Sequence, residues 1–428
     1  MTDPRPEFHA AHAPVGLRRY AAVWRLPGAP TLTIAGVLGR LPVGMAPLAL
    51  VLLVQQTTGS YTPAGVAMAA YAVSNAVMGP VLGRLADRFG PVPVLLGTAV
   101  AYPIAIAAVL GAVFTDAPVA LIWTAAALLG ACQPPLTATL RSVWADLTEP
   151  PASHLREPAL ALETTVFEIV FVLGPMLVGA LAAIGSPVAA FVGAAILAAG
   201  GTTTVALGKA TRAWRPHPDR PHVRGFGPAA APGMPMLLLV AAGITFAFGI
   251  VGVALPAFAG LHASAESAEG IAGLLLGLYG VGSVAGGLWF GTRRFTAALS
   301  SQWATTLGAV AVGMAALAVV PSIPLMIAAL LLTGLTLAPA LTVENALVAR
   351  IAPAGMVNEA YTWVATVAFA SSAAGAAVAG VAVDRPGGVP LAFGLAAVGT
   401  AIGAVAAALP GGPLRRAEQF STLSQATR

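Results

Sequence analysis

Hydrophobic residues along this chain form long runs that are separated by short polar breaks. Most runs hold about 20 to 27 residues, and a helix of that length, rising 1.5 Å per residue, crosses the ~30 Å hydrocarbon core of a bilayer. Continuous apolar runs of this length predict helices rather than strands. We expect twelve membrane-spanning helices, at about residues 29–55, 63–83, 91–114, 118–143, 158–184, 187–208, 234–260, 269–291, 301–320, 322–348, 358–383 and 388–410.

The composition agrees with this pattern. Of the 428 residues, 58% are hydrophobic and 9% are charged, whereas soluble domains carry about 25% charged residues. The mean hydropathy is +0.86. The composition therefore predicts an all-α integral membrane protein in contact with the lipid bilayer.

Several kinds of chemistry are excluded. Cys132 is the only cysteine, which rules out disulfides and thiolate metal sites. The six histidines lie outside the predicted runs, so we expect no metal and no cofactor within the membrane. No GxxxxGK[ST] motif is present, so ATP is not the energy source. The runs also lack Ser/His constellations, and we therefore do not expect an enzyme.

Basic residues are confined to one side of the predicted bilayer. With the N-terminus inside, every Lys and Arg lies in an inside segment except Arg40, within the first run, and Arg385, in an outer loop. Positively charged loops stay in the cytoplasm. The sequence thus predicts a multi-pass protein of the cytoplasmic membrane with both termini inside. The same bias explains the pI near 9.9 without a nucleic-acid partner.

The chain divides into two similar halves. Tyr71 and Gly83 recur as Tyr279 and Gly291, and PPLTATLRSVWADL is echoed by APALTVENALVARI. Six-helix repeats of this kind are a transporter architecture, with the substrate site at their interface. We predict a cytoplasmic segment at 1–28, a six-helix bundle at 29–208, a cytoplasmic linker at 209–233, a second bundle at 234–410 and a cytoplasmic tail at 411–428.

A loop motif between the second and third runs carries the most specific resemblance. The segment GRLADRFGPVPVL (83–95) resembles the loop signature of the major facilitator superfamily at Gly83, Asp87, Arg88 and Gly90. Gly83 suits close helix packing, Gly90 suits a left-handed turn, and Asp87 can accept hydrogen bonds at a helix end. Pro-Val-Pro replaces the basic pair of that family. The resemblance implies two pseudo-symmetric six-helix bundles and secondary transport by alternating access.

A second motif favours export by exchange. The segment GPMLVG resembles the fifth-helix motif of antiporters in this superfamily at Gly174, Pro175 and Gly179, and it departs from that motif at Val178. Plain packing of small residues is the alternative explanation. An arginine that drug:proton antiporters often carry in span 4 is missing, because Ala126 occupies its position.

Ionisable residues within the runs are candidates for function, since each costs several kcal/mol unless it is paired or faces water. Arg40 and Glu168 lie about 16 and 15 Å deep from the same face at 1.5 Å per residue. Helices 1 and 5 are neighbours in the fold of the superfamily, so we predict an Arg40–Glu168 pair. Its role is translocation or, alternatively, structure alone. Glu163, roughly 140° away from Glu168 around the helix, is predicted to act as a gate, as is its counterpart Glu359.

Glu344 is the second carboxylate candidate, for coupling to protons or another cation. It lies in the tenth run, about 9 Å inside its cytoplasmic end. Polar and aromatic residues that could line the same space are Tyr71, Asn75, Gln133, Tyr279, Asn345 and Trp363. Each is alternatively a helix-packing residue.

The leading hypothesis is proton-coupled export of a small apolar compound or metabolite. The second is uptake of a small organic anion that Arg40 anchors, by symport or by facilitated diffusion. The expected partners are a small-molecule substrate, protons or another coupling ion, and the bilayer. We expect the protein to act as a monomer.

Overall fold

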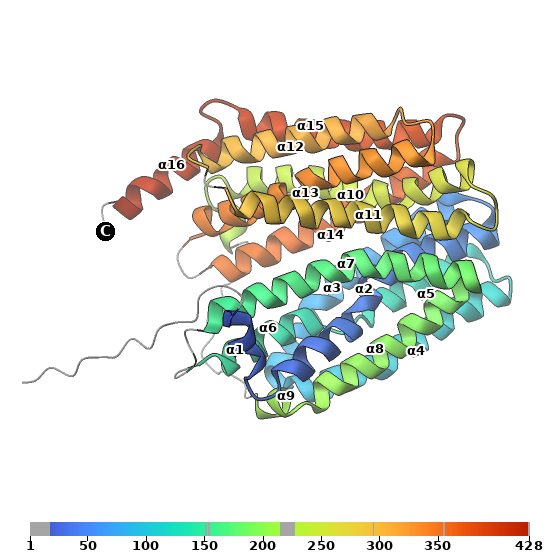
Figure 1. The fold of residues 1–428 in the computed structure, drawn as a ribbon, viewed down its shortest axis with the longest axis horizontal. Helices are drawn as coiled ribbons and strands as arrows, with labels where there is room; N and C mark the ends of the chain where they lie inside the picture. The colour runs from blue at the N-terminus through green and yellow to red at the C-terminus, as the bar shows by residue number, and fades with distance from the viewer. Residues whose placement is uncertain are drawn as a thin grey trace, which may run out of the picture.

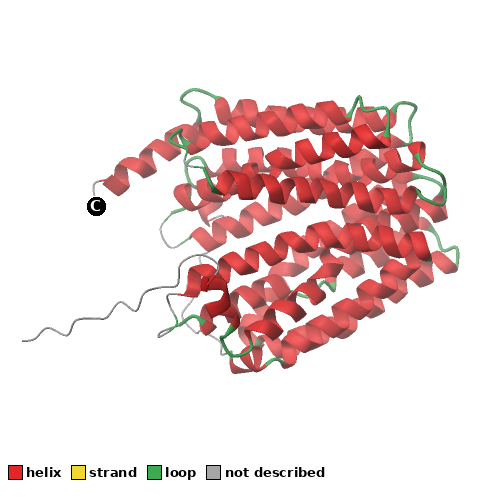
Figure 2. Cartoon of the chain, viewed as in Figure 1, coloured by secondary structure: helices red, strands yellow, loops and turns green. Residues whose placement is uncertain are grey.

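A computed structural model describes residues 18–149, 152, 155–214, 227–293, 295–353 and 356–426, and this part of the chain is helical with no strand. Figure 2 shows helices joined by short loops at the two ends of the molecule. The helices are α1 (Arg18–Trp24), α2 (Ala29–Thr58), α3 (Tyr61–Phe89), α4 (Pro91–Phe114), α5 (Val119–Ala131), α6 (Leu136–Leu147), α7 (Arg156–Ile184), α8 (Pro187–Leu207), α9 (Lys209–Ala213), the 3₁₀ helix η2 (Gly227–Ala230), α10 (Met234–His262), α11 (Ala268–Gly291), α12 (Leu299–Leu317), α13 (Ile323–Ile351), α14 (Val357–Val383), α15 (Gly388–Ala408) and α16 (Pro413–Ala426).

Among the described residues, eleven segments are long and apolar enough to cross a membrane. They coincide with eleven of the twelve predicted spans. The twelfth prediction, 301–320, falls on α12, a 19-residue helix whose first turns carry Ser300, Ser301 and Gln302. These polar residues lower its hydropathy, although the helix lies alongside α15 and α13 like the others.

The fourth predicted span is two helices rather than one. α5 ends at Ala131 and α6 begins at Leu136, with residues 132–135 between them in no regular structure. Pro134 and Pro135 have no backbone N–H to continue the helical ladder. Such an interruption is tolerated at membrane depth only where protein buries it, and here Gln133 and Pro134 are buried.

The long helices run side by side in two groups (Figure 1). In one group α2, α3, α4, α5 and α8 pack in a ring with α7 against α2, and in the other α10–α15 pack together. The groups meet mainly where α3 contacts α14 and α7 contacts α11. We call the end at which α1, α9 and α16 lie the basic end, and the opposite end the far end (Figure 1).

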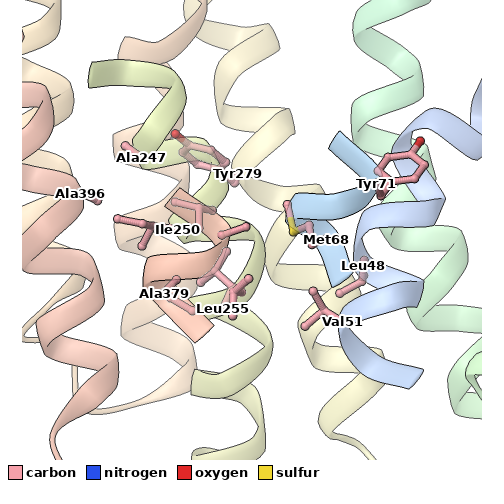
Figure 3. Close-up of a cluster of buried hydrophobic side chains, with 14 of the residues drawn as sticks. Leu48, Val51, Met68, Tyr71, Ala247, Ile250, Leu255, Tyr279, Ala379 and Ala396 are labelled. Carbon is pink, nitrogen blue, oxygen red and sulfur yellow. The ribbon is translucent and has the colours of Figure 1, made fainter. Parts of the chain in front are cut away.

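A continuous apolar core joins the two groups. Figure 3 shows Leu48, Val51 and Met68 of α2 and α3 beside Ile250 and Leu255 of α10. These side chains belong to one buried cluster that extends through both groups. The core is dominated by alanine and medium-sized aliphatic residues, which allows the helices to approach closely.

Contacts between the groups are tightest in the far half. A β-carbon placed on Gly273 of α11 would lie 2.5 Å from the carbonyl oxygen of Pro175 on α7. One placed on Gly380 of α14 would lie 2.5 Å from the carbonyl oxygen of Tyr61 on α3. Real β-carbons do not tolerate such separations, so glycine is what allows the helices to meet there.

Candidate transport site

A buried ion pair joins α2 and α7 within the first group. Arg40 is 1% exposed and Glu163 is 4% exposed. The Nη1 and Nη2 atoms of Arg40 donate to the two carboxylate oxygens of Glu163 at 2.5 and 3.3 Å. Arg40 Nε also donates to the carbonyl oxygen of Gly36 at 2.9 Å, and its guanidinium lies 5.9 Å from the ring centre of Phe167. Each of the three guanidinium nitrogens of Arg40 therefore donates to a protein group.

The predicted Arg40–Glu168 pair is wrong, because Arg40 pairs with Glu163 instead. Helical side chains lean toward the N-terminus of their helix, and the bond from Arg40 to Gly36, one turn earlier, shows this direction. The guanidinium therefore reaches the level of Glu163, which is about 7.5 Å nearer the basic end than Glu168 at 1.5 Å per residue. Glu168 is half-buried on α7.

Two residues of α6 add to the electrostatics of this pair. Arg141 and Trp144 lie beside the carboxylate of Glu163. The short helix after the break in span 4 thus contributes a second cation and an indole to the pair. Glu163 is thus a buried member of a polar network between α2, α6 and α7, and its predicted role as a gate stays a prediction.

Glu344 on α13 is buried without the partners that Glu163 has. Its side chain is 5% exposed, and its Oε2 atom is buried with no hydrogen-bond partner among the described residues. The preceding Val343 and the following Leu347 and Val348 are also buried. An ionised carboxylate in such apolar surroundings carries a large desolvation cost.

Two of the predicted lining residues are brought together at the break in span 4. The hydroxyl of Tyr71 on α3 donates to Oε1 of Gln133 at 3.0 Å. Gln133 Nε2 is buried with no partner among the described residues, as is the hydroxyl of Tyr102 on α4. Tyr102 lies within electrostatic reach of Tyr71. The interruption thus sits in a buried polar cluster of the first group.

The remaining predicted lining residues lie on four different helices and differ in exposure. Asn75 and Trp363 are half-buried, and Tyr279 is buried with its ring edge toward Phe248 at 6.4 Å. Asn345 is exposed and donates to the carbonyl oxygen of Leu341 at 2.9 Å. Glu344 and Asn345 are adjacent in sequence, but one is buried and the other exposed.

The loop motif at 83–90 has the predicted turn but not the predicted packing. Gly90 adopts φ 87°, a region that favours glycine. Gly83, predicted to allow close helix approach, has open space where a β-carbon would point, so that prediction is wrong. Asp87 and Arg88 are exposed, and Arg88 lies over the ring of Phe89 at 5.2 Å.

Glu359 lies in the first turn of α14 and is half-buried. Its carboxylate faces Gly227 of η2, where an added β-carbon would lie 2.5 Å from Oε1. The residue is therefore placed between the linker and the second group at the basic end. A negative charge in the first turn of a helix is also favoured by the helix dipole.

The antiporter-like motif lies where α7 crosses two neighbours. A β-carbon on Gly174 would lie 2.6 Å from the carbonyl carbon of Gly44 on α2. One on Gly179 would lie 2.9 Å from the carbonyl oxygen of Gly270 on α11. The motif therefore links the core of the first group to the contact between groups, in the far half of the molecule.

A polar contact at the far end was not predicted. Asp384, directly after α14, accepts hydrogen bonds from the hydroxyls of Ser60 and Thr62 at 2.6 Å each, and from the N–H groups of Tyr61 and Thr62 at 2.8 Å each. Partial burial raises the pKa of this carboxyl, but these hydrogen bonds outweigh burial and hold the pKa below its usual value. Gln56 also donates to Glu269 across the same end. The sequence shows a Ser-Tyr-Thr helix start and an aspartate directly after an apolar run, but no local pattern pairs the two segments.

Fold and site together define a polytopic helical transporter. Two six-helix groups meet through small residues, and ionisable side chains are buried in their interiors. Residues 32–293, more than half of the chain, match the model of the Major Facilitator Superfamily. The chain belongs to this family, and it is a secondary transporter rather than an enzyme.

Relatives of known sequence and structure agree with the family. The chain is 32% identical over 167 residues to the uncharacterized MFS-type transporter y4rN of Sinorhizobium fredii, a match that covers 38% of this chain and 40% of that protein. The structure is similar to the POT family transporter PepTSo, with a TM-score of 0.69, 12% identity and coverage of 95% and 99% of the two chains. It is also similar to a bacterial homolog of the human lysosomal transporter Spinster in an inward-facing conformation, with a TM-score of 0.62, 16% identity and coverage of 97% and 98%.

Proposed function

We propose that this transporter exports a small, mostly apolar compound or metabolite in exchange for protons. One observation carries the proposal, namely the different surroundings of the two carboxylates that are buried within the described membrane-spanning helices. Glu163 is neutralised by Arg40, whereas Oε2 of Glu344 has no hydrogen-bond partner among the described residues. Proton coupling needs a carboxylate that can gain and lose a proton during the cycle, and Glu344 fits that need.

In the proposed cycle, Glu344 carries the proton and the Arg40–Glu163 pair has a structural role. A proton from the more acidic side binds the Glu344 carboxylate and neutralises it, so the buried side chain no longer carries a desolvation cost. The bundles then rock, and the proton leaves to the opposite side as cargo binds. The Arg40–Glu163 pair stays closed throughout, because both residues belong to the same bundle.

The antiporter-like motif supports exchange over uptake. Gly174, Pro175 and Gly179 lie at crossings of α7 with α2 and α11, where a rocking motion must pivot. The fold alone does not select a cargo, since solved structures of similar fold include a nucleoside transporter and a peptide transporter.

Uptake of an anion by Arg40 is the weaker alternative. An anchoring arginine has to be reachable, but Arg40 is 1% exposed and its guanidinium is held by Glu163 and Gly36. Because the Arg40 guanidinium is held by protein groups, it is not available to an anion, and this favours neutral or cationic cargo.

We further propose that the basic end faces the cytoplasm. The support is the distribution of Lys and Arg over the chain and the positive-inside rule. The far-end contacts then close the outer side, so the structure represents an inward-facing state. Reporters fused after Arg428 and within 209–233 should both read as cytoplasmic, and an external reading for the linker would contradict the model of two six-span halves.

Transport in proteoliposomes tests the coupling. A thermal-shift screen of the purified protein against metabolites and apolar drugs supplies the cargo, as the compound that raises the melting temperature most. Glu344→Gln should abolish cargo movement driven by a pH gradient while counterflow without a gradient persists. The matched control is Glu266→Gln, which removes an exposed carboxylate at the far end. This variant should transport normally. If Glu344→Gln still moves cargo in response to a pH gradient, the proposal is wrong.

A further inference from the structure

A groove of about 330 Å³ opens on the outer surface of the first bundle, between the basic halves of α2 and α8. Its walls include Ile34 and Leu38, which are 54% and 40% exposed. Its floor is Gly200 and Gly201. Gly201 presses against Gly39 of α2, whereas Gly200 is exposed with open space where a side chain would point. The groove therefore exists because position 200 has no side chain.

The groove offers almost nothing polar to an occupant. Its lining is mostly aliphatic or glycine, and the polar side chains among it are Thr31 and Thr204. The hydroxyl of Thr204 already donates to the carbonyl oxygen of Gly200 at 2.7 Å. Both walls are helices long and apolar enough to span the membrane. A groove of this composition in the hydrocarbon layer is suited to an acyl chain.

Two basic residues, Arg25 and Lys209, adjoin the segments that pack together near the basic end of the groove. Gly28, two residues before the lining residue Pro30, packs on Ala210, with 3.3 Å between an added β-carbon and the Ala210 Cβ atom. This contact brings the turn before α2 against the start of α9. Arg25 lies three residues before Gly28, Lys209 directly precedes Ala210, and both are exposed.

An interfacial aromatic residue sits beside these charges. Trp24 at the end of α1 is 41% exposed, and exposed tryptophans are typical of the headgroup level of a bilayer. Basic pockets between membrane helices at this level are suited to anionic lipid headgroups.

We propose that the groove is a binding site for one anionic phospholipid, with an acyl chain between α2 and α8 and its phosphate held by Arg25 and Lys209. The charge at the mouth favours a phospholipid over an uncharged apolar cargo, which would gain nothing from two cations. The site is separate from the buried carboxylates and does not depend on their role in transport.

Native mass spectrometry of the full-length protein tests the site. The protein is released from nanodiscs that contain equal amounts of palmitoyl-oleoyl phosphatidylglycerol and palmitoyl-oleoyl phosphatidylcholine, and the retained lipids are counted. The wild type should keep one phosphatidylglycerol in preference to phosphatidylcholine. Gly200→Leu fills the groove, and Arg25→Gln with Lys209→Gln removes the charge. Each variant should reduce retained phosphatidylglycerol at least about fivefold.

Matched variants separate this site from general lipid contact. Gly97→Leu adds the same side chain at another exposed glycine of the first bundle with open space around it. Arg293→Gln with Arg416→Gln removes two exposed charges from the second half of the chain. Both controls should keep the lipid. The proposal is overturned if Gly200→Leu retains as much phosphatidylglycerol as Gly97→Leu, if the two charge variants behave alike, or if the groove retains both lipids equally.

Discussion

Each half of this transporter buries one acidic side chain within a membrane-spanning helix, Glu163 on α7 and Glu344 on α13, and the two have opposite surroundings. Glu163 and Glu344 are 4% and 5% exposed. The first meets a guanidinium at 2.5 Å, with Arg141 and Trp144 alongside. The second has a buried oxygen without a partner among the described residues. Burial alone therefore does not tell a structural carboxylate from one suited to carry a proton.

The difference follows from where the partners lie. Arg40 and Glu163 come from α2 and α7 of the same half, so a rocking motion between halves moves them together and need not break the pair. Glu344 forms no ion pair with any residue that the structure describes, which is what the proposed proton coupling requires of it. We therefore assign the paired Glu163 to the stability of one half and propose the unpaired Glu344 for the transport cycle.

The largest expected effect comes from breaking the pair. Arg40→Ala leaves Glu163 buried without its cation, which should cost about 3–5 kcal/mol of stability. Replacing both residues, as Arg40→Met with Glu163→Leu, should restore most of it, because buried pairs are often replaceable by apolar groups. The melting temperature in detergent and the monodisperse yield measure both effects.

Glu168→Gln is the matched control for that experiment. It removes a carboxylate from the same helix that does not bond Arg40, so its melting temperature should stay close to that of the wild type. An equal loss of stability in Glu168→Gln and Arg40→Ala would contradict the assigned pairing.

The sequence predicted the fold better than the pairing. Uninterrupted apolar runs and the 83–95 motif were enough to predict the helices and the family, since hydrocarbon thickness dictates helix length. The predicted partner of Arg40 is wrong because the depth of a Cα atom does not give the depth of the end of a long side chain. A long side chain that leans back by a turn changes its level by about 5 Å, one helical pitch.

Other features had weaker signals in the sequence. In the sequence, Pro134 and Pro135 are compatible with one kinked helix or with two separate helices in span 4. Which of the two forms depends on the tertiary packing that buries Gln133. The contact of Asp384 with Ser60 and Thr62 joins positions more than 300 residues apart, and no local pattern reports such a pairing.

The second prediction changes Glu344 to an apolar side chain. Glu344→Met removes a buried carboxyl that lacks a full set of partners, so the melting temperature should rise, by the equivalent of about 1–3 kcal/mol. Leu347→Ala, a change in the buried neighbour one turn away, should lower it and so shows that the region is packed. A fall in the melting temperature of Glu344→Met would mean that the carboxyl has a stabilising partner.

The third prediction compares the repeated tyrosines of the two halves. Tyr71→Phe removes the hydrogen bond to Gln133 Oε1 and should cost about 1 kcal/mol. Tyr279→Phe keeps its edge contact with Phe248 and should change stability by less than about 0.5 kcal/mol. Chemical denaturation in mixed micelles measures the free energy of unfolding of both variants. An equal decrease in Tyr71→Phe and Tyr279→Phe would contradict the predicted difference between the two tyrosines.

The smallest expected effect concerns Asp384, a carboxylate that bonds across the two halves rather than within one. Because Asp384 is exposed, it contributes less than about 1 kcal/mol to the stability of the closed far end. Opening of the far end nevertheless has to break all four of its hydrogen bonds. Asp384→Asn should therefore increase the population that is open at the far end. Spin labels at Thr57→Cys and Glu266→Cys, in a Cys132→Ala background, report this as a longer distance between labels.

The pH dependence of that distance has a defined sign. Because the pKa of Asp384 is held below its usual value, its contribution to closure is complete above that value and is lost only as the pH falls through the lower pKa of the closed state. The label distance should thus stay constant from pH 8 to about pH 5 and lengthen only in stronger acid. Asp116→Asn, a change in another exposed far-end carboxylate, should follow the wild-type curve. Lengthening near neutral pH would instead assign far-end closure to a different titrating group, with Glu344 the first to test.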